Sequence, residues 1–249
     1  MLKLDRKDTG WIISFIYLAY AYLGQLPFLR QLDVFSTAIS SFVLIGAYAI
    51  SSVLIIGAKS SAKFFIVAAV IGSAMELLSL NTGFPFGRYY YTNELGAMLG
   101  PLPVFIPLLW ASLGFYAYMA GGKYGMPFLM VFTDLALDPR FSGHLWIWIS
   151  KTQYFGDPVT NFVGWFFTSA LIILVFVALQ KLDHGISYPA IVFYLFSGIN
   201  ECISDLYAQL LLPAIIAGVI FIVSFLILFH FRYSKDKMLR KQSQNRIAS

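Results

Sequence analysis

Apolar runs of about 20 residues recur from one end of this 249-residue chain to the other. A helix needs about 20 apolar residues to cross the hydrocarbon core of a bilayer. Backbone polar groups in lipid must pair within the structure, and runs this continuous predict helices rather than the alternating strands of a barrel. The mean hydropathy of +0.76 excludes an ordinary soluble domain. The sequence therefore predicts an all-α, polytopic integral membrane helical bundle.

We expect about eight transmembrane helices in a single transmembrane domain, residues 1–231, followed by a basic tail, residues 232–249. The expected spans are residues 11–29, 34–57, 63–80, 101–120, 124–138, 159–180, 188–207 and 211–231. The basic residues Lys3, Arg6 and Lys7 precede the first run and resemble a signal peptide. That run continues to Leu29, which predicts an uncleaved first span.

The basic residues divide unevenly between the two sets of loops. With both termini cytoplasmic, thirteen Lys and Arg residues fall on the inner side and four on the outer side. This bias predicts a multi-pass protein of the cell membrane in that orientation. A seven-span alternative would place the basic tail outside. We interpret the tail as a contact with membrane lipids and expect no nucleic acid as a partner.

Five carboxylates lie in or at the ends of the apolar runs: Glu76, Asp134, Asp138, Glu201 and Asp205. A carboxylate at the centre of a membrane helix costs about 2.5 to 3.5 kcal/mol and by default marks a functional site. In the expected topology all five lie at the outer ends of their spans, beside the loops 81–100 and 139–158. The alternative without a functional role is that they are helix-end acids facing the lipid headgroups.

Four of these acids form two pairs with the spacing i, i+4, which stacks side chains on one face of a helix. They are Asp134 with Asp138, and Glu201 with Asp205. Carboxyl groups held that close tend to share a proton. Asn161, near the start of the sixth expected span, is a neutral donor and acceptor at similar depth. It either caps that span or orients a water molecule.

Aromatic residues crowd both outer loops. Gly83, Pro85 and Gly87 predict turns in the first loop. The candidate substrate-binding residues are Phe86, Arg88, Tyr89, Tyr90, Trp146, Trp148, Tyr154, Trp165 and Asp205. An interfacial aromatic belt is the alternative to a loop that folds back over the acids.

Familiar soluble-enzyme motifs do not occur in the sequence. It has one cysteine, Cys202, and three histidines without metal-ligand spacing, so we expect no metal site and no cofactor. Carboxylic acids among aromatic rings suit acid-catalysed alkene chemistry. A protonated acid delivers H⁺ to the double bond, ring faces stabilise the resulting tertiary cation, and a second polar group holds the water that captures it.

At these residues the chain resembles the membrane carotenoid-biosynthesis family that includes bisanhydrobacterioruberin hydratase and carotenoid 1,2-hydratases. The resemblance covers roughly residues 70 to 170. The matching positions are Glu76, Thr82–Tyr91, Leu95–Gly96, Pro103, Asp134–Pro139, Gly143, Trp146, Trp148, Tyr154–Gly156, Pro158, Asn161–Phe162 and Gly164–Trp165. Asp157, where the family pattern suggests an apolar residue, and Lys151–Gln153, which lacks an expected glycine, depart from it.

The resemblance implies an enzyme that adds water to the terminal C=C of a long acyclic carotenoid without a redox cofactor. From the residues, we expect Asp134 or Glu76 to donate the proton and Asp138 to tune it. Asn161 or Glu201 would position the water. The cation site would be lined by Tyr89, Tyr90, Trp146 and Trp148. The expected partners are a long-chain carotenoid or polyprenyl substrate and membrane lipids, and we also consider association with other carotenoid-pathway enzymes.

Three alternatives remain at this point. A Mg²⁺-dependent membrane prenyltransferase would use the acid pairs to bind metal and diphosphate. Few outer-side cations are available to hold phosphates, namely Arg88, Arg140 and Lys151. A carotenoid end cyclase would use the same cation chemistry. A proton-coupled transporter or carotenoid-binding membrane protein would use the acids as a relay.

Overall fold

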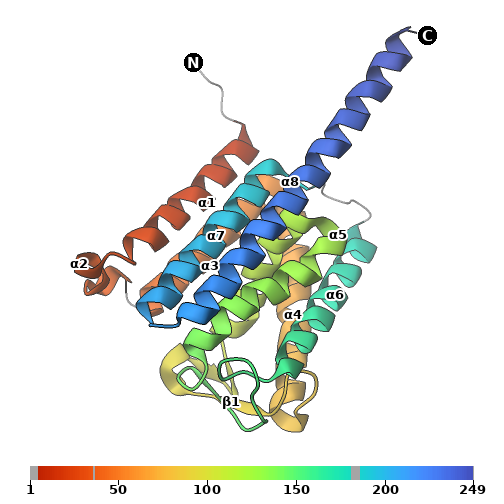
Figure 1. Cartoon of the computed structure of the whole chain (residues 1–249). Helices are drawn as coiled ribbons and strands as arrows, with labels where there is room; N and C mark the ends of the chain where they lie inside the picture. The colour runs from red at the N-terminus through yellow and green to blue at the C-terminus, as the bar shows by residue number, and fades with distance from the viewer. Residues whose placement is uncertain (1–4, 36, 181–185, 249) are drawn as a thin grey trace.

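Long helices make up most of the chain in the computed structural model, which describes residues 5–35, 37–180 and 186–248 (Figure 1). The helices are α1 (Arg6–Leu23), α2 (Pro27–Arg30), α3 (Thr37–Ile56), α4 (Ala58–Thr82), α5 (Phe105–Phe141), α6 (Val159–Gln180), α7 (Tyr188–Tyr207) and α8 (Leu211–Ala248). The strands are β1 (Tyr89–Tyr91), β2 (Met98–Leu99), β3 (Leu102–Pro103) and β4 (Trp146–Trp148). Lys3, Lys181 and His184, used in the sequence argument, lie outside the described residues.

Five of these helices are long and apolar enough to cross a membrane, namely α3, α4, α5, α6 and α8. Helices α1 and α7 contain 18 and 20 residues, but charged side chains lower their hydropathy. A membrane-spanning helical protein is therefore the class that the fold defines. The count of eight spans and the cytoplasmic position of the termini stay predictions.

Helix α5 contains the fourth and fifth expected spans as two arms that meet at Gly122. That residue has φ 63° and ψ −167°, a conformation that glycine adopts at least cost. The arms run back along each other, because a Cβ on Gly114 would lie 3.1 Å from Met126 and one on Gly121 would lie 2.9 Å from Leu129. The start and the end of α5 therefore lie at the same end of the bundle.

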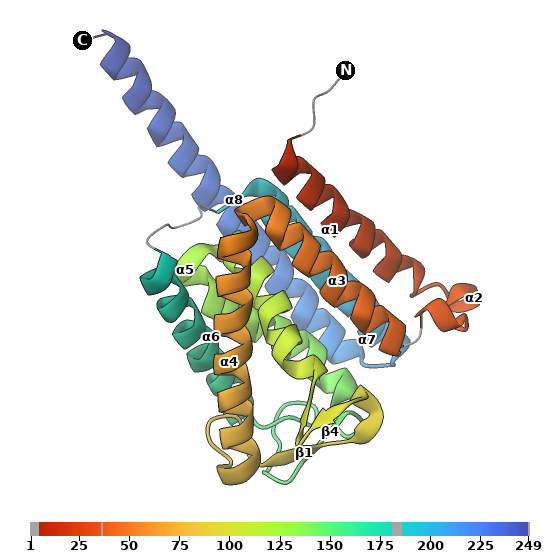
Figure 2. The ribbon, with the colours of Figure 1, turned by 180° about the vertical axis from the view of Figure 1, so that it is seen from behind.

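The two arms of α5 form the centre of the bundle. In α5, 72% of the span is buried inside the protein, against 28% to 39% in the four other candidate spans. Apolar residues such as Ile66, Val70, Phe167 and Leu174 are exposed on the outside of α4 and α6, as expected for lipid-facing helices. Figure 2 shows α3 and α4 covering α5 from the opposite side to Figure 1.

Several expected boundaries are wrong. The first span ends at Leu23 instead of residue 29, because Gly24 caps α1 and Pro27 begins the separate helix α2. The third begins five residues early at Ala58, and the fourth begins at Phe105 because β3 precedes it. Helix α8 continues past residue 231 to Ala248 and projects beyond the bundle (Figure 1).

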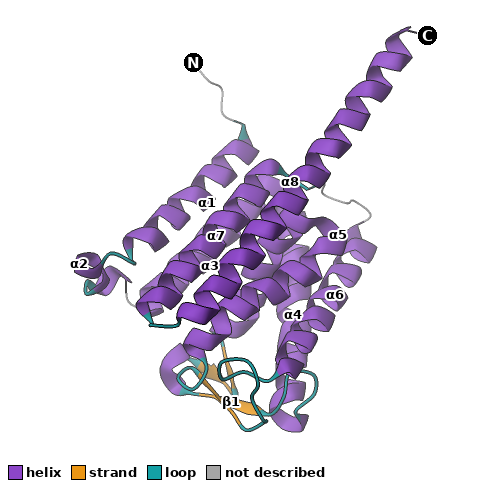
Figure 3. Cartoon of the chain, viewed as in Figure 1, coloured by secondary structure: helices purple, strands orange, loops and turns teal. Residues whose placement is uncertain are grey.

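The expectation of an all-helical chain also needs correction at the loop end. Strands β1 and β4 pair antiparallel, with Tyr89 opposite Trp148 and Tyr91 opposite Trp146. Alternating aromatic residues favour extended pairing. This small sheet lies at the end of the bundle opposite the start of α1 and the end of α8 (Figure 3). It joins the two outer loops of the sequence argument into one cap.

Candidate functional site

The β1–β4 ladder presents its aromatic side chains on one face. The Tyr89 and Trp148 ring centroids are 4.7 Å apart, and those of Tyr91 and Trp146 are 6.3 Å apart. Side chains at alternate positions of a strand share a face, so Tyr90 points the other way and is 52% exposed. The ladder therefore offers four rings to the interior.

Glu76 of α4 is buried against this aromatic face. Its Oε2 accepts a hydrogen bond from the Tyr89 hydroxyl and one of 2.9 Å from the Tyr91 hydroxyl. Its Oε1 accepts a 2.8 Å bond from Nε1 of Trp110. Burial raises the pKa of both phenols well above the usual value, so they remain protonated donors. Three donors surround Glu76 as they would a carboxylate anion.

Glycine makes room for one of these donors. A Cβ on Gly72 would lie 2.7 Å from Cγ of Trp110, so a side chain at this position of α4 would displace the indole. The Trp110 ring is in turn stacked between Phe86, at 6.0 Å, and Trp165, at 4.2 Å. The donor to Glu76 is thus held by rings from the first loop and from α6.

Asp134 and Asp138 share Asn161 of α6 as a common donor. Asn161 Nδ2 lies 2.9 Å from Asp134 Oδ2 and 2.6 Å from Asp138 Oδ2. The shared amide holds the two carboxyl groups close together, and carboxyl groups held this close tend to share a proton. All three residues are buried. The i, i+4 spacing thus places both acids on the face of α5 that meets Asn161, and the sharing of a proton between them stays a prediction.

A cavity of about 50 Å³ lies between Glu76 and Asp138, and we call it the acid chamber. It is lined by two carboxyl groups, one amide, two aliphatic and seven aromatic side chains: Glu76, Asp138, Asn161, Ile106, Leu109, Phe86, Tyr89, Tyr91, Trp110, Trp146, Trp148 and Trp165. A single water needs about 10 to 15 Å³ in a cavity, so the chamber has room for a few waters or a small branched hydrocarbon group. Asp134 lies behind this wall.

A larger cavity of about 600 Å³ adjoins the acid chamber. The two share Ile106, Leu109, Asp138, Trp146 and Trp165 as lining residues. The larger cavity continues between α1, α3, α5, α7 and α8, and most of its wall is apolar or aromatic. A long apolar molecule could therefore lie in the larger cavity with one end at Asp138.

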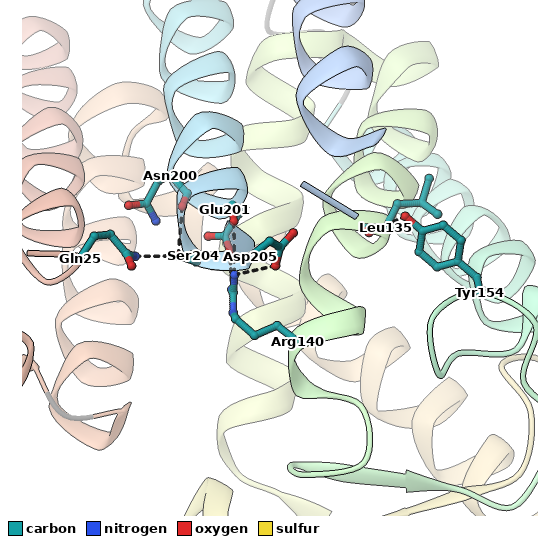
Figure 4. Close-up of polar contacts among 8 residues, drawn as sticks. All are labelled: Gln25, Leu135, Arg140, Tyr154, Asn200, Glu201, Ser204 and Asp205. Carbon is teal, nitrogen blue, oxygen red and sulfur yellow. Dashed lines mark hydrogen bonds and ion pairs between the residues drawn. The ribbon is translucent and has the colours of Figure 1, made fainter. Parts of the chain in front are cut away.

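Glu201 and Asp205 lie apart from the acid chamber. Both pair with Arg140 near the end of α5: Nη1 lies 3.2 Å from Asp205 Oδ1, and Nη2 forms an ion pair with Glu201 Oε2. Figure 4 shows Arg140 extending to both acids on α7, with Gln25 and Ser204 beside them. Gln25 Nε2 donates to Ser204 Oγ at 2.6 Å. The cluster connects the segment that follows α1 with α5 and α7.

Asp157 is a fourth buried acid near the chamber, and the sequence argument did not include it in the site. Nε1 of Trp148 donates to Asp157 Oδ1 at 2.7 Å. Burial raises the pKa of Asp157 to about 6, while the nearby Trp148, Ser142 and Trp146 donors act in the opposite direction. The only signal in the sequence was a polar residue where an apolar one was expected.

The structure brings together most of the expected site residues. Glu76, Asp138, Asn161, Phe86, Tyr89, Trp146, Trp148 and Trp165 line the acid chamber. The side chains of Arg88 and Tyr90 are exposed instead, and Tyr154 donates to the Leu135 carbonyl at 3.1 Å. Tyr91 and Trp110 also line the chamber but were not among the expected site residues. Tyr91 belongs to the aromatic loop, but nothing in the sequence singled out Trp110.

Within the described part of the chain, no three His, Cys, Asp or Glu residues are grouped to hold a metal ion.

The fold and the chamber define an integral membrane protein with a buried acid site beside a long apolar cavity. The family model of carotenoid biosynthesis proteins matches residues 36–224, and the chain belongs to that family. The chain is also 28% identical over 117 residues to bisanhydrobacterioruberin hydratase of Haloarcula japonica. That match covers 41% of this chain and 40% of the relative. No solved structure matches the chain.

Proposed function

We propose that this carotenoid-biosynthesis protein is a hydratase that adds water to the terminal C=C of a long acyclic carotenoid. The observation that carries the proposal is the acid chamber, where Asp138, backed by Asp134, and the separately bound Glu76 face one small aromatic space. The name of the Haloarcula relative supports the same reaction class.

Asp138 is the proton donor in this proposal. It lines the chamber, whereas its partner Asp134 lies behind it and supplies the shared proton. This assignment differs from the one expected from the sequence, in which Asp134 or Glu76 donates the proton and Asp138 tunes it. Asn161 donates to both carboxyl groups and fixes their relative orientation.

Glu76 acts as the base. Its three hydrogen bonds come from neutral donors, which favour the carboxylate form without supplying a cation that would neutralise it. It stabilises the cation electrostatically and accepts a proton from the attacking water. The ring faces of Trp165 and the β1–β4 aromatics stabilise the cation by about 0.5 to 2 kcal/mol for each well-placed ring.

The atoms balance without a further reagent. Asp138 transfers H⁺ to the less substituted alkene carbon, and the π electrons form the new C–H bond. Water adds its oxygen to the tertiary cation and loses H⁺ to Glu76, giving a tertiary alcohol. The proton then returns from Glu76 to the Asp134–Asp138 pair through water in the chamber, so that no proton is consumed overall.

The substrate chain would lie in the larger cavity. Its apolar and aromatic wall suits a polyene, and the shared residues Asp138, Trp146 and Trp165 place one end of the chain at the acid chamber. Because the chamber is small, it favours an open, branched chain end.

Expression of the chain in a bacterium that makes lycopene or a longer acyclic carotenoid tests the proposal. We expect pigment heavier by the mass of one or two waters, detected by mass spectrometry of the extract. The matched control is the Glu94→Gln variant, which changes an exposed loop acid. Unchanged pigment with every acyclic carotenoid supplied, despite protein in the membrane, would contradict the proposal.

A further inference from the structure

The carboxylate of Asp157 is completely buried beneath β4, although it lies in a loop. The chain forms a tight turn here, in which Tyr154 and Asp157 exchange backbone hydrogen bonds of 2.9 and 2.8 Å. Phe155 and Gly156 adopt positive φ values of 43° and 108° within that turn. A non-glycine residue in this region is uncommon and is held by its surroundings. The turn thus directs an acid inward.

The Asp157 carboxylate faces the indole N–H groups of β4. Trp148 Nε1 donates to Oδ1 at 2.7 Å, and the Trp146 indole also acts on the carboxylate from the same face of the strand. Oδ2 of Asp157 and Nε1 of Trp146 are both buried without a hydrogen-bond partner. Asp157 therefore lies behind the two indoles whose rings line the acid chamber.

Trp148 connects this acid to the other side of the chamber. Its ring lies 4.7 Å from that of Tyr89, and Tyr89 donates to Glu76. Movement of the Trp148 indole would disturb the phenol that binds Glu76. A negative charge at the indole N–H also increases the electron density of the ring, which strengthens its attraction for a cation.

We infer that Asp157 is a positioning residue that fixes the Trp148 indole in the chamber wall and, through its charge, increases the ability of that ring to stabilise a cation. The inference rests on the proposed function for its catalytic consequence. The contact between Asp157 and Trp148 can be tested without any turnover. Asp157 does not reach the chamber itself, so it touches neither substrate nor water there.

The charge of Asp157 gives this role a pH dependence. Burial raises its pKa from 3.8 to about 6, so the carboxylate is mostly ionised at pH 7 and becomes neutral below pH 6. The titratable groups that interact with it are Asp134 and Asp138 on α5 and Tyr154 in its own loop. From β4 and from Ser142 it meets only neutral donors.

The free energy of unfolding depends on pH for the same reason. Between pH 3.8 and about 6 the folded state binds more protons at Asp157 than the unfolded state does. Stability from this group is therefore present at low pH and is lost as the pH rises through that window. The Asp157→Asn variant, which keeps the shape and an oxygen acceptor, removes this dependence.

The test compares the wild type with Asp157→Asn and Trp148→Phe, using Glu94→Gln as an exposed-acid control. Ultraviolet resonance Raman spectra report the hydrogen bonding of the indole N–H. We expect a Trp148 signal that titrates near pH 6 in the wild type and the control, and that does not titrate in Asp157→Asn. Trp148→Phe assigns the signal by removing it.

Kinetics then separate positioning from simple structural support. We expect Asp157→Asn to lower kcat about tenfold, to leave KM within about twofold and to lose the step near pH 6 from the pH profile, while the limb due to Glu76 remains. An indole signal that does not change between the wild type and Asp157→Asn would overturn the inference. So would an unchanged kcat and pH profile beside an altered signal. Failure of the wild type to hydrate would instead reject the proposed function, since the spectra do not depend on it.

Discussion

Asp138 and Asp134 lie one helical turn apart, but only Asp138 reaches the acid chamber. Their spacing in the sequence predicted a proton-sharing pair, and both are buried and bound by Asn161. The sequence could not decide which member faces the acid chamber. That depends on how α5 is rotated against α6, and the rotation follows from packing across the whole helix.

At the residue scale, we expect Asp138→Asn to lower hydration by about 10² to 10⁴-fold, because an amide cannot deliver the proton. Product formed in membranes that contain equal amounts of protein is the measurement. Asp236→Asn, which changes an acid on the projecting part of α8, is the matched control. Wild-type activity in Asp138→Asn would remove that residue from the mechanism.

Glu76→Gln tests the base separately. The new amide replaces one of the two acceptor oxygens by an NH2 donor, so at least one of the Tyr89, Tyr91 and Trp110 donors loses its acceptor. We expect hydration to be lost in Glu76→Gln and largely retained in Tyr91→Phe, which removes one of three donors. Equal losses of hydration activity in the two variants would show that activity depends on the hydrogen-bond network rather than on the carboxylate itself.

At the scale of elements, the sequence predicted the aromatic loops but not their pairing. Tyr89–Tyr91 and Trp146–Trp148 are separated by more than fifty residues, and nothing local in either segment specifies the other. The tight turn that buries Asp157 was missed for the same reason. Long apolar helices, in contrast, follow from local composition, and five of the expected spans lie in helices long and apolar enough to cross a membrane.

The contact of α6 with the first loop gives a test at this scale. A Cβ on Gly164 would lie 2.3 Å from Cδ1 of Phe86, so Gly164→Ala must move a ring that lines the chamber. We expect hydration activity to fall at least about tenfold, because displacing a ring of the chamber wall would misplace the reacting groups. Gly125→Ala is the control, because no atom lies within 4 Å of its added Cβ. Equal activity in both variants would contradict this account of the contact.

At the scale of the whole molecule, Arg140 joins the end of α5 to α7 through two acids. The pairs of acids on spans five and seven were expected to converge on one pocket. Instead, Glu201 and Asp205 neutralise Arg140, and Arg140 and Glu201 line the larger cavity. The sequence placed an arginine and two acids at the same end of the bundle, but their pairing required the positions of three helices.

We expect Arg140→Gln to destabilise the protein by about 3 to 5 kcal/mol, because Asp205 is fully buried and would lose its cation. Thermal unfolding in detergent measures the change. Arg232→Gln, which breaks a more exposed pair on α8, should have an effect below about 1 kcal/mol. Equal melting temperatures for the two variants would show that Arg140 does not hold α5 to α7.

Incorporation of oxygen from heavy-oxygen water is the most direct test of the central claim. Purified protein is incubated with an acyclic carotenoid in that solvent, and the product is examined by mass spectrometry. Water capture of a cation in the acid chamber predicts one labelled oxygen for each end modified, absent in Asp138→Asn. A modified product without labelled oxygen, or a labelled product from Asp138→Asn at the wild-type rate, would contradict it.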